Sequence, residues 1–152
     1  MTKTETDRIE KQIVLRAPLA RVWKALTDAE EFGTWFRVRL KGPFAAGRRV
    51  TGQITYPGYE HVTMDVTVER MESERLFSFR WHPGAVDPKM NYDKEPATLV
   101  EFRLEKADGG TRLTVVESGF DAIPPSRRDE AFRMNSEGWT IQVENIRRHV
   151  DG

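Results

Sequence analysis

The sequence contains no cysteine, and this absence excludes disulfide bonds, thiolate nucleophiles and cysteine metal ligands together. No apolar run approaches the ~20 residues that a membrane-spanning helix requires. The N-terminal stretch MTKTETDR has no hydrophobic segment of the kind found in secretory signal peptides. These absences favour a cytoplasmic protein without a membrane span.

An excess of charge of either sign is also missing, because 24 lysines and arginines balance 24 aspartates and glutamates. Nucleic-acid-binding proteins usually carry a basic excess, so no nucleic-acid partner is expected. The motifs G-x-S-x-G, H-E-x-x-H and G-x-G-x-x-G do not occur. The three histidines, His61, His82 and His149, are scattered without metal-ligand spacing. We therefore expect neither a metal site nor a cofactor.

What the sequence does contain is alternation of apolar and polar residues, the pattern of strands in an antiparallel sheet with one solvent-exposed face. A first strand is predicted from Ile9 to Ala17. Six further strands are centred on residues 38–40, 50–54, 62–68, 77–81, 100–104 and 113–115. The turn signal Asp108-Gly109-Gly110 predicts a hairpin between the last two.

Helical spacing separates the first strand from the others and returns at the end of the chain. Val22, Leu26 and Ala29 recur every three or four residues after Pro18. Thr27-Asp28 followed by Glu30-Glu31 has capping-box spacing and predicts a second short helix. After Pro124-Pro125, a final helix over residues 126–150 is expected to span roughly 37 Å.

One sheet and one long helix predict an α+β domain covering residues 8–152, preceded by a disordered tail over residues 1–7. The helix is the only large cover for the apolar face of the sheet. Since a helix is only ~10 Å wide, it cannot fill the concavity of seven twisted strands. The remaining space is packed by large side chains or left as a cavity.

Three stretches of this sequence resemble the homologues of the activator of heat-shock-protein-90 ATPase. They are APLARVWKALTDAEEFGTWF, GGTRLTVVESGF and EGWTIQVENIRRHV, and the resemblance extends roughly from Ile9 to Val150. That family is a branch of the START-like, birch-pollen-allergen-like superfamily. The resemblance implies the helix-grip fold, with a curved seven-stranded sheet wrapped on a long C-terminal helix around a hydrophobic cavity. Activities in the superfamily range from lipid carriage to cyclase chemistry to chaperone regulation, so the fold leaves the function open.

Glu117 is the residue with the most unusual predicted environment. If Leu113 and Val115 point inward, Glu117 does too, and an unpaired buried carboxylate costs several kcal/mol. Lys11 has the inward phase of the first strand, which neighbours the last strand in the helix-grip topology, so the two could form an ion pair. The alternatives are that both reach solvent at the rim of the sheet, that Glu117 positions a ligand, or that it acts as a general acid or base.

The remaining candidate ligand contacts are aromatic residues and two irregular positions on the final helix. Asn135 is a polar residue in an apolar stripe, and Gly138 costs ~1 kcal/mol against alanine. Gly138 either admits a ligand or strand, or makes room for Trp35 or Trp81. The long connector from Pro83 to Pro96 has the length of a lid but equally that of a disordered link. The full set of predicted ligand-binding residues is Trp35, Phe79, Trp81, Phe102, Glu117, Asn135, Gly138 and Trp139.

Three functions are compatible with these observations. The first is binding of a small hydrophobic or amphipathic molecule, such as a lipid or aromatic metabolite, in the internal cavity. The second, implied by the resemblance, is a chaperone or stress-response accessory, although the eukaryotic activators make much of their chaperone contact through a second domain for which 152 residues leave no room. The third is a cyclase- or hydrolase-like enzyme using Glu117, for which no second catalytic group is evident.

Overall fold

The computed structural model describes residues 7–83, 92 and 95–151. Its elements confirm the predicted order of one strand, two short helices, six strands and a long helix. They are β1 (Arg8–Leu15), α1 (Leu19–Thr27), α2 (Ala29–Phe36), β2 (Val38–Leu40), β3 (Arg49–Ile54), β4 (Thr63–Glu72), β5 (Leu76–Trp81), β6 (Thr98–Ala107), β7 (Gly110–Ser118), the 3₁₀ helix η2 (Phe120–Ala122) and α3 (Pro125–Asp151).

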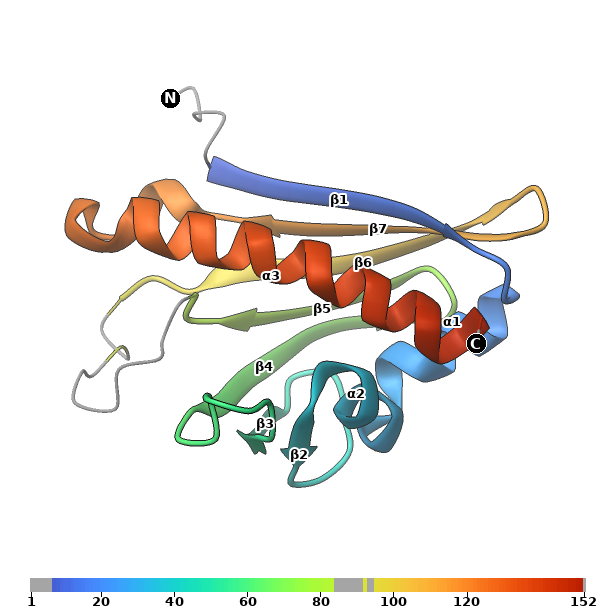
Figure 1. Cartoon of the computed structure of the whole chain (residues 1–152), viewed down its shortest axis with the longest axis horizontal. Coiled ribbons are helices and arrows are strands. Elements are labelled where there is room, and N and C mark those ends of the chain that lie inside the picture. Colours follow the sequence, from blue (N-terminus) through green and yellow to red (C-terminus); the bar gives the residue numbers. More distant parts are fainter. Residues whose placement is uncertain (1–6, 84–91, 93–94, 152) are drawn as a thin grey trace.

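The seven strands form one antiparallel sheet in the order β1-β7-β6-β5-β4-β3-β2 (Figure 1). The first strand lies beside the last, and Ile9 is the partner of Glu117 in this pairing. The predicted hairpin joins β6 to β7, where Ala107 pairs with Gly110 and Gly109 has a φ of 81°. The register shifts once, between Val68 and Arg70 of β4, at a β-bulge.

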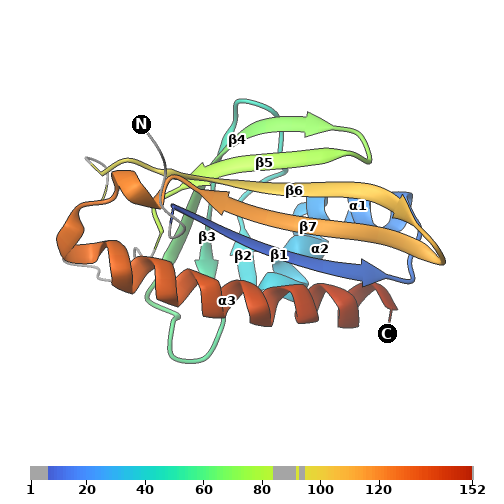
Figure 2. The ribbon, with the colours of Figure 1, turned by 90° about the horizontal axis from the view of Figure 1, so that it is seen from above.

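Helix α3 lies along one face of the sheet and is closest to β1 (Figures 1 and 2). Its 27 residues correspond to a length of about 40 Å. Ala131, Trp139 and Ile146 are the buried residues of this helix and face the sheet. At its C-terminal end Asp151 accepts hydrogen bonds from the backbone N–H groups of Arg16 and Ala17, at 3.0–3.1 Å. The helix is therefore fixed to the link between β1 and α1.

The two short helices close the end of the sheet at which α3 terminates (Figure 1). Asp28 is the N-cap of α2, and its side chain accepts the N–H groups of Glu30 and Glu31 at 3.0 and 3.1 Å. The indole N–H of Trp35 donates to the backbone oxygen of Ala25 at 2.8 Å. This bond joins α2 to α1.

An aromatic cluster fills the core between the sheet and the helices. Phe32 of α2 lies 5.3 Å from Phe44 and 6.4 Å from Phe79, measured between ring centroids. Phe77 and Phe102 stack at 5.9 Å across β5 and β6. All of these side chains are buried. Large side chains thus occupy this part of the concavity, and an internal cavity stays a prediction.

Two expectations fall largely outside the described residues. The tail over residues 1–6 lies outside them, whereas Asp7, which we had included in the tail, is buried and accepts the backbone N–H of Asp121 at 3.1 Å. Most of the connector between Pro83 and Pro96 also lies outside them. In the described part of the chain, no helix combines the length and hydropathy of a membrane span.

Candidate functional site

Glu117 lies on the concave face of the sheet and its side chain has no solvent exposure. Its orientation follows from the phase of β7, which Leu113 and Val115 share, and the pairing to β1 and β6 continues without a bulge although Val116 on the other face is buried as well. The alternative of a position at the solvent-exposed rim is therefore wrong for Glu117. Burial removes water from the carboxylate, so the protein must supply its hydrogen bonds.

Four uncharged side chains supply them. Oε1 accepts from the indole N–H of Trp139 at 2.8 Å and from Nδ2 of Asn135 at 2.9 Å. Oε2 accepts from the indole N–H of Trp81 at 2.8 Å, from the hydroxyl of Thr98 at 2.6 Å and from the same amide at 3.1 Å. We call these five residues the Glu117 network. It joins strands β5, β6 and β7 to α3.

The predicted ion pair between Lys11 and Glu117 is wrong. Lys11 pairs with Val115 across the β1–β7 ladder, and Ile9 occupies the position beside Glu117. Among the described residues, no lysine, arginine or histidine forms an ion pair with Glu117. Burial raises the pKa of the Glu117 carboxyl, while the hydrogen bonds from Thr98 and the other donors act in the opposite direction and only partly offset it.

The members of the Glu117 network differ in how far they reach toward solvent. Thr98 and Trp139 are buried, with exposures of 0% and 2%, whereas Trp81 and Asn135 are only half-buried. The rings of Trp81 and Trp139 stack with centroids 5.8 Å apart and planes 29° apart. Their N–H groups both point to Glu117, so the carboxylate holds the two indoles in one orientation.

Eight residues were predicted to bind a ligand, and the structure brings four of them, Trp81, Glu117, Asn135 and Trp139, into direct hydrogen bonding. Phe102 lies against Trp139, with ring centroids 5.7 Å apart, and Phe79 against Trp81 at 5.2 Å. Trp35 lies further away, 6.4 Å from Phe102. These three are core side chains next to the network, and their contact with a ligand stays a prediction.

Gly138, the eighth predicted residue, precedes Trp139 on α3 and is half-buried. A methyl group added at its Cα would meet no atom of the described protein within 4 Å. The expectation that Gly138 makes room for Trp35 or Trp81 is therefore wrong. The position that an added methyl group would take is open space.

The model of the family described as "Activator of Hsp90 ATPase homolog 1-like protein" matches residues 16–151 of this chain. The chain belongs to this family. No curated protein matches the sequence at a significant level. The family assignment agrees with the resemblance seen in the sequence, and it covers every element of the Glu117 network.

Solved structures similar to this chain share its fold at low sequence identity. Protein MLL2253 from Mesorhizobium loti is 22% identical with a TM-score of 0.75, covering 95% of this chain and 96% of that one. DynU16, from the dynemicin biosynthetic locus, is 23% identical with a TM-score of 0.74, covering 95% and 47%. The Aha1 dimer from Colwellia psychrerythraea is 15% identical with a TM-score of 0.69, covering 94% and 95%. These likenesses show the helix-grip fold.

The sequence did not single out Thr98 as a member of this network. Thr98 lies two and four residues before Val100 and Phe102, so the alternation that predicted their inward orientation applies to it equally. Because a threonine in a strand is unremarkable, it attracted no attention. The signal was present in the phase of the strand.

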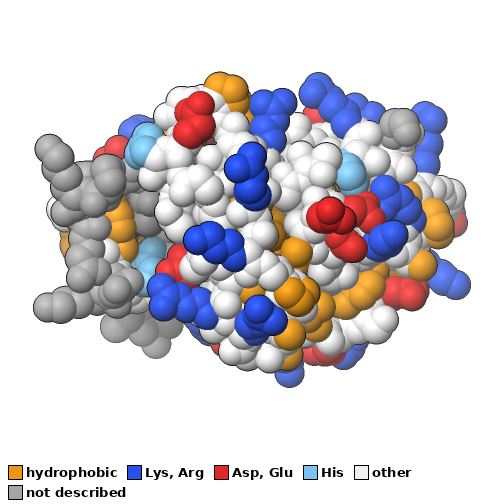
Figure 3. Space-filling view, turned by 90° about the horizontal axis from the view of Figure 1, so that it is seen from below, with side chains coloured by type: hydrophobic (Ala, Val, Ile, Leu, Met, Phe, Trp, Pro, Cys, Tyr) orange, Lys and Arg blue, Asp and Glu red, His pale blue; other side chains and the backbone are white. Residues whose placement is uncertain are grey.

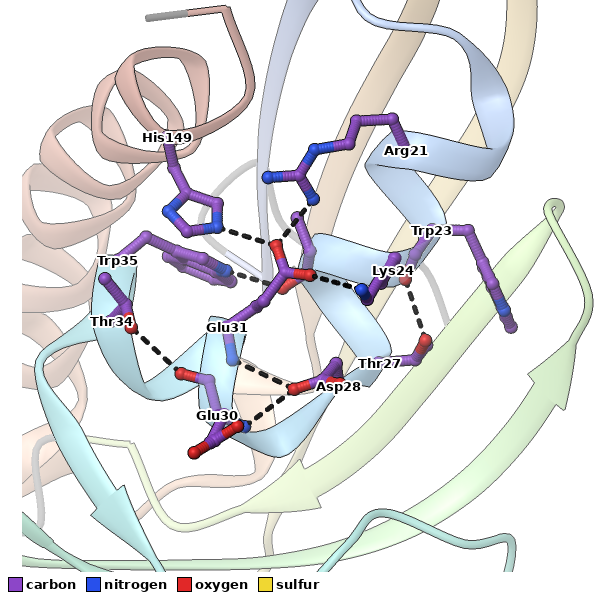
Figure 4. A network of polar contacts seen from close by, with 11 residues as sticks. Arg21, Trp23, Lys24, Thr27, Asp28, Glu30, Glu31, Thr34, Trp35 and His149 are labelled. Carbon is purple, nitrogen blue, oxygen red and sulfur yellow. Dashed lines mark hydrogen bonds and ion pairs between the residues drawn. The ribbon is translucent and has the colours of Figure 1, made fainter.

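A second polar cluster, also missed, joins all three helices around Glu31 (Figure 4). The carboxylate of Glu31 accepts from Arg21 of α1 at 2.5 Å and contacts Nε2 of His149 of α3 at 2.8 Å. Burial raises the pKa of Glu31, but the hydrogen bonds and charges of Arg21 and His149 together outweigh it, so the pKa is lowered. No short-range pattern connects Glu31 to His149, which lies 118 residues away.

The convex face of the sheet has the character of a solvated surface. A cavity of about 530 Å³ lies there, lined mainly by charged side chains that include Arg70, Glu72, Arg75 and Arg103. Arg70 and Arg75 both form ion pairs with Glu72. On the face seen in Figure 3, side chains of both signs are likewise interspersed. Among the described residues, no group of three or more potential ligands could hold a metal ion.

Proposed function

We propose that this protein binds a small hydrophobic or amphipathic molecule between α3 and the concave face of the sheet, with the Glu117 network at the polar end of the site. The observation that carries the proposal is a fully buried carboxylate held by uncharged donors, two of which are stacked indoles. Gly138, which precedes Trp139 on α3, has open space at the position of an added methyl group.

A core without a ligand-binding role would not need this arrangement. Burying a carboxylate costs several kcal/mol, and a core built of hydrophobic side chains in place of the whole network would avoid that cost. Apolar walls with a few convergent polar groups are also the usual composition of a small-molecule site. Trp81, Phe79 and Phe102 supply the walls here, and the Glu117 network supplies the polar groups.

Filling the space beside Gly138 tests this proposal. We expect native mass spectrometry of the protein, incubated with a panel of lipids and aromatic metabolites, to detect a bound molecule. The variant Gly138→Leu places its Cβ in open space, and on this proposal its side chain extends into the site, so binding should weaken at least about tenfold. Thermal unfolding verifies that the variant remains folded.

The matched control is Glu137→Leu, which adds the same side chain to the same helix at an exposed position. It should bind the panel like the unmodified protein. Equal binding by Gly138→Leu and Glu137→Leu, or absence of any bound molecule across the panel, would contradict the proposal.

The description of the family favours one further candidate, an accessory of the Hsp90 chaperone. Its test is a pull-down with the host homologue of Hsp90, together with an assay of the chaperone ATPase with and without this protein. Stimulation of the ATPase supports the accessory role, and absence of both binding and stimulation removes it.

The enzyme hypothesis receives less support from the geometry. The groups that contact Glu117 are two indoles, a hydroxyl and an amide, and none of them transfers a proton readily near neutral pH. A carboxylate whose lone pairs are occupied by these donors is built to hold their positions. We therefore propose binding in preference to catalysis.

A further inference from the structure

The Glu117 network has a directional property: every hydrogen bond within it runs toward Glu117. Trp81, Thr98, Asn135 and Trp139 all donate, and the carboxylate only accepts. Indole N–H groups have no acceptor function, so their direction is fixed by chemistry. The hydrogen-bond donors of these side chains are therefore occupied by Glu117. Acceptor atoms of the same side chains point away from the carboxylate.

Asn135 presents such an acceptor. Its Nδ2 contacts both oxygens of Glu117, at 2.9 and 3.1 Å, which fixes the amide so that Oδ1 points away from the carboxylate. Within the described residues, Oδ1 accepts no hydrogen bond, and it is not among the buried unsatisfied atoms. Asn135 is half-buried, so this oxygen is open to a partner from outside.

The stacked indoles add a second electron-rich surface. Trp81 is half-buried, shares the acceptor Glu117 with Asn135, and stacks on Trp139 with ring centroids 5.8 Å apart. The face of an indole attracts cations more strongly than any other aromatic side chain. Behind both surfaces lies the carboxylate of Glu117, without a basic side chain paired to it in the described part of the chain. All three features favour positive charge and hydrogen-bond donors.

From this we infer that the ligand carries a protonated amine attached to an apolar body. The ammonium group would lie against Trp81 and donate to Oδ1 of Asn135, with the Glu117 carboxylate as its counter-charge, while the apolar body extends toward the space beside Gly138 and the phenylalanine walls. This inference rests on the proposed function, whose ligand class it narrows from any small amphipathic molecule to a cationic one.

Three probes that share one chain and differ only in the head group test the inference. Decylammonium, decanol and decanoate are compared by titration calorimetry at neutral pH and about 0.15 M salt, where weak surface attraction is screened. We expect decylammonium to bind at least about tenfold more tightly than either of the others. Glu117→Gln should abolish this preference, because it removes the counter-charge of the ammonium group.

Two further variants keep the test decisive. Glu105→Gln removes an exposed carboxylate from the convex face of the sheet and should leave the preference for the amine unchanged. If Glu117→Gln does not fold, Asn135→Leu removes the Oδ1 acceptor while Trp81, Thr98 and Trp139 still hold Glu117, and should reduce the preference.

The outcomes separate the two proposals. Equal affinity for the three probes, or a preference for the amine that survives both substitutions in the network, overturns the inference while the proposed function stands. Absence of binding by all three probes to the unmodified protein contradicts both.

Discussion

At the scale of single residues, the sequence identified Glu117 and Asn135 separately but not as partners. Alternation along β7 predicted that Glu117 faces inward if Leu113 and Val115 do, and this phase holds because the strand has no bulge; a position at the rim of the sheet had stayed open as an alternative. The one partner suggested for it, Lys11, was wrong. Which residue of α3 reaches the carboxylate depends on the rotation of that helix over the sheet, and helical periodicity gives the apolar stripe without giving its register on the strands.

Two buried hydroxyl groups on neighbouring strands allow the contribution of the network to be measured. Thr98→Val removes a donor from Glu117 with little change of shape, so we expect a loss of about 1–3 kcal/mol in the free energy of unfolding. Ser78 is also buried, but its hydroxyl has no hydrogen-bond partner among the described residues. Ser78→Ala should therefore be neutral or stabilise by up to ~1 kcal/mol. Urea unfolding of both variants gives the comparison, and similar losses in the two would contradict it.

At the scale of elements, the sequence predicted the type and order of every strand and long helix. Strand periodicity, the Asp28 cap and the Asp108-Gly109-Gly110 turn are local signals, and the structure confirms each of them. The space around a helix, in contrast, depends on residues that are distant in the sequence. The surroundings of Gly138 depend on which side chains the facing strands present, and this is why the expected steric role for that glycine was wrong.

Two helical glycines therefore give opposite predictions for the same substitution. Gly138→Ala meets no protein atom within 4 Å, so the gain in helix propensity should stabilise the protein by ~1 kcal/mol. At Gly33 of α2, an added methyl group would overlap the backbone oxygen of Val38. Gly33→Ala should therefore destabilise the protein despite the same gain in propensity. Thermal unfolding decides between these signs, and stabilisation by both substitutions would contradict the packing assigned to α2.

At the scale of the whole molecule, two carboxylates hold the helices in place in opposite electrostatic settings. Glu117 attaches α3 to three strands through uncharged donors, whereas Glu31 joins the three helices through Arg21 and His149. The balance of charges in the composition gives no indication of either arrangement. Both are contacts between residues distant in sequence, and they exist only once the sheet has brought the helices together.

The Glu31 cluster should stabilise the fold at neutral pH and weaken in acid. The pKa of Glu31 is lowered in the folded protein. The contribution of its carboxylate to stability is therefore present above the ordinary pKa of 4.5 and is lost as the pH falls through the folded pKa. The variant Glu31→Gln has no carboxylate to protonate at this position, so its free energy of unfolding should depend less on pH in that acid range. Urea titrations at a series of pH values measure the difference, with Glu30→Gln, an exposed neighbour, as the control. The same fall in the free energy of unfolding at acid pH in Glu31→Gln and in the unmodified protein would exclude this role.

Glu117 should give the opposite dependence. Because burial raises its pKa, the folded protein retains a proton that the unfolded chain releases above 4.5. The stability linked to that proton is fully present below 4.5 and is lost as the pH rises through the folded pKa, with a slope of at most ~1.4 kcal/mol per pH unit. The side chains that contact Glu117 from β5, β6 and α3 are all uncharged, so no neighbouring titration masks this decline. Glu117→Gln should remove this decline in the free energy of unfolding, whereas the control Glu105→Gln should retain it. Parallel pH profiles of stability for the two variants would mean that Glu117 ionises at the same pH in the folded and unfolded chains.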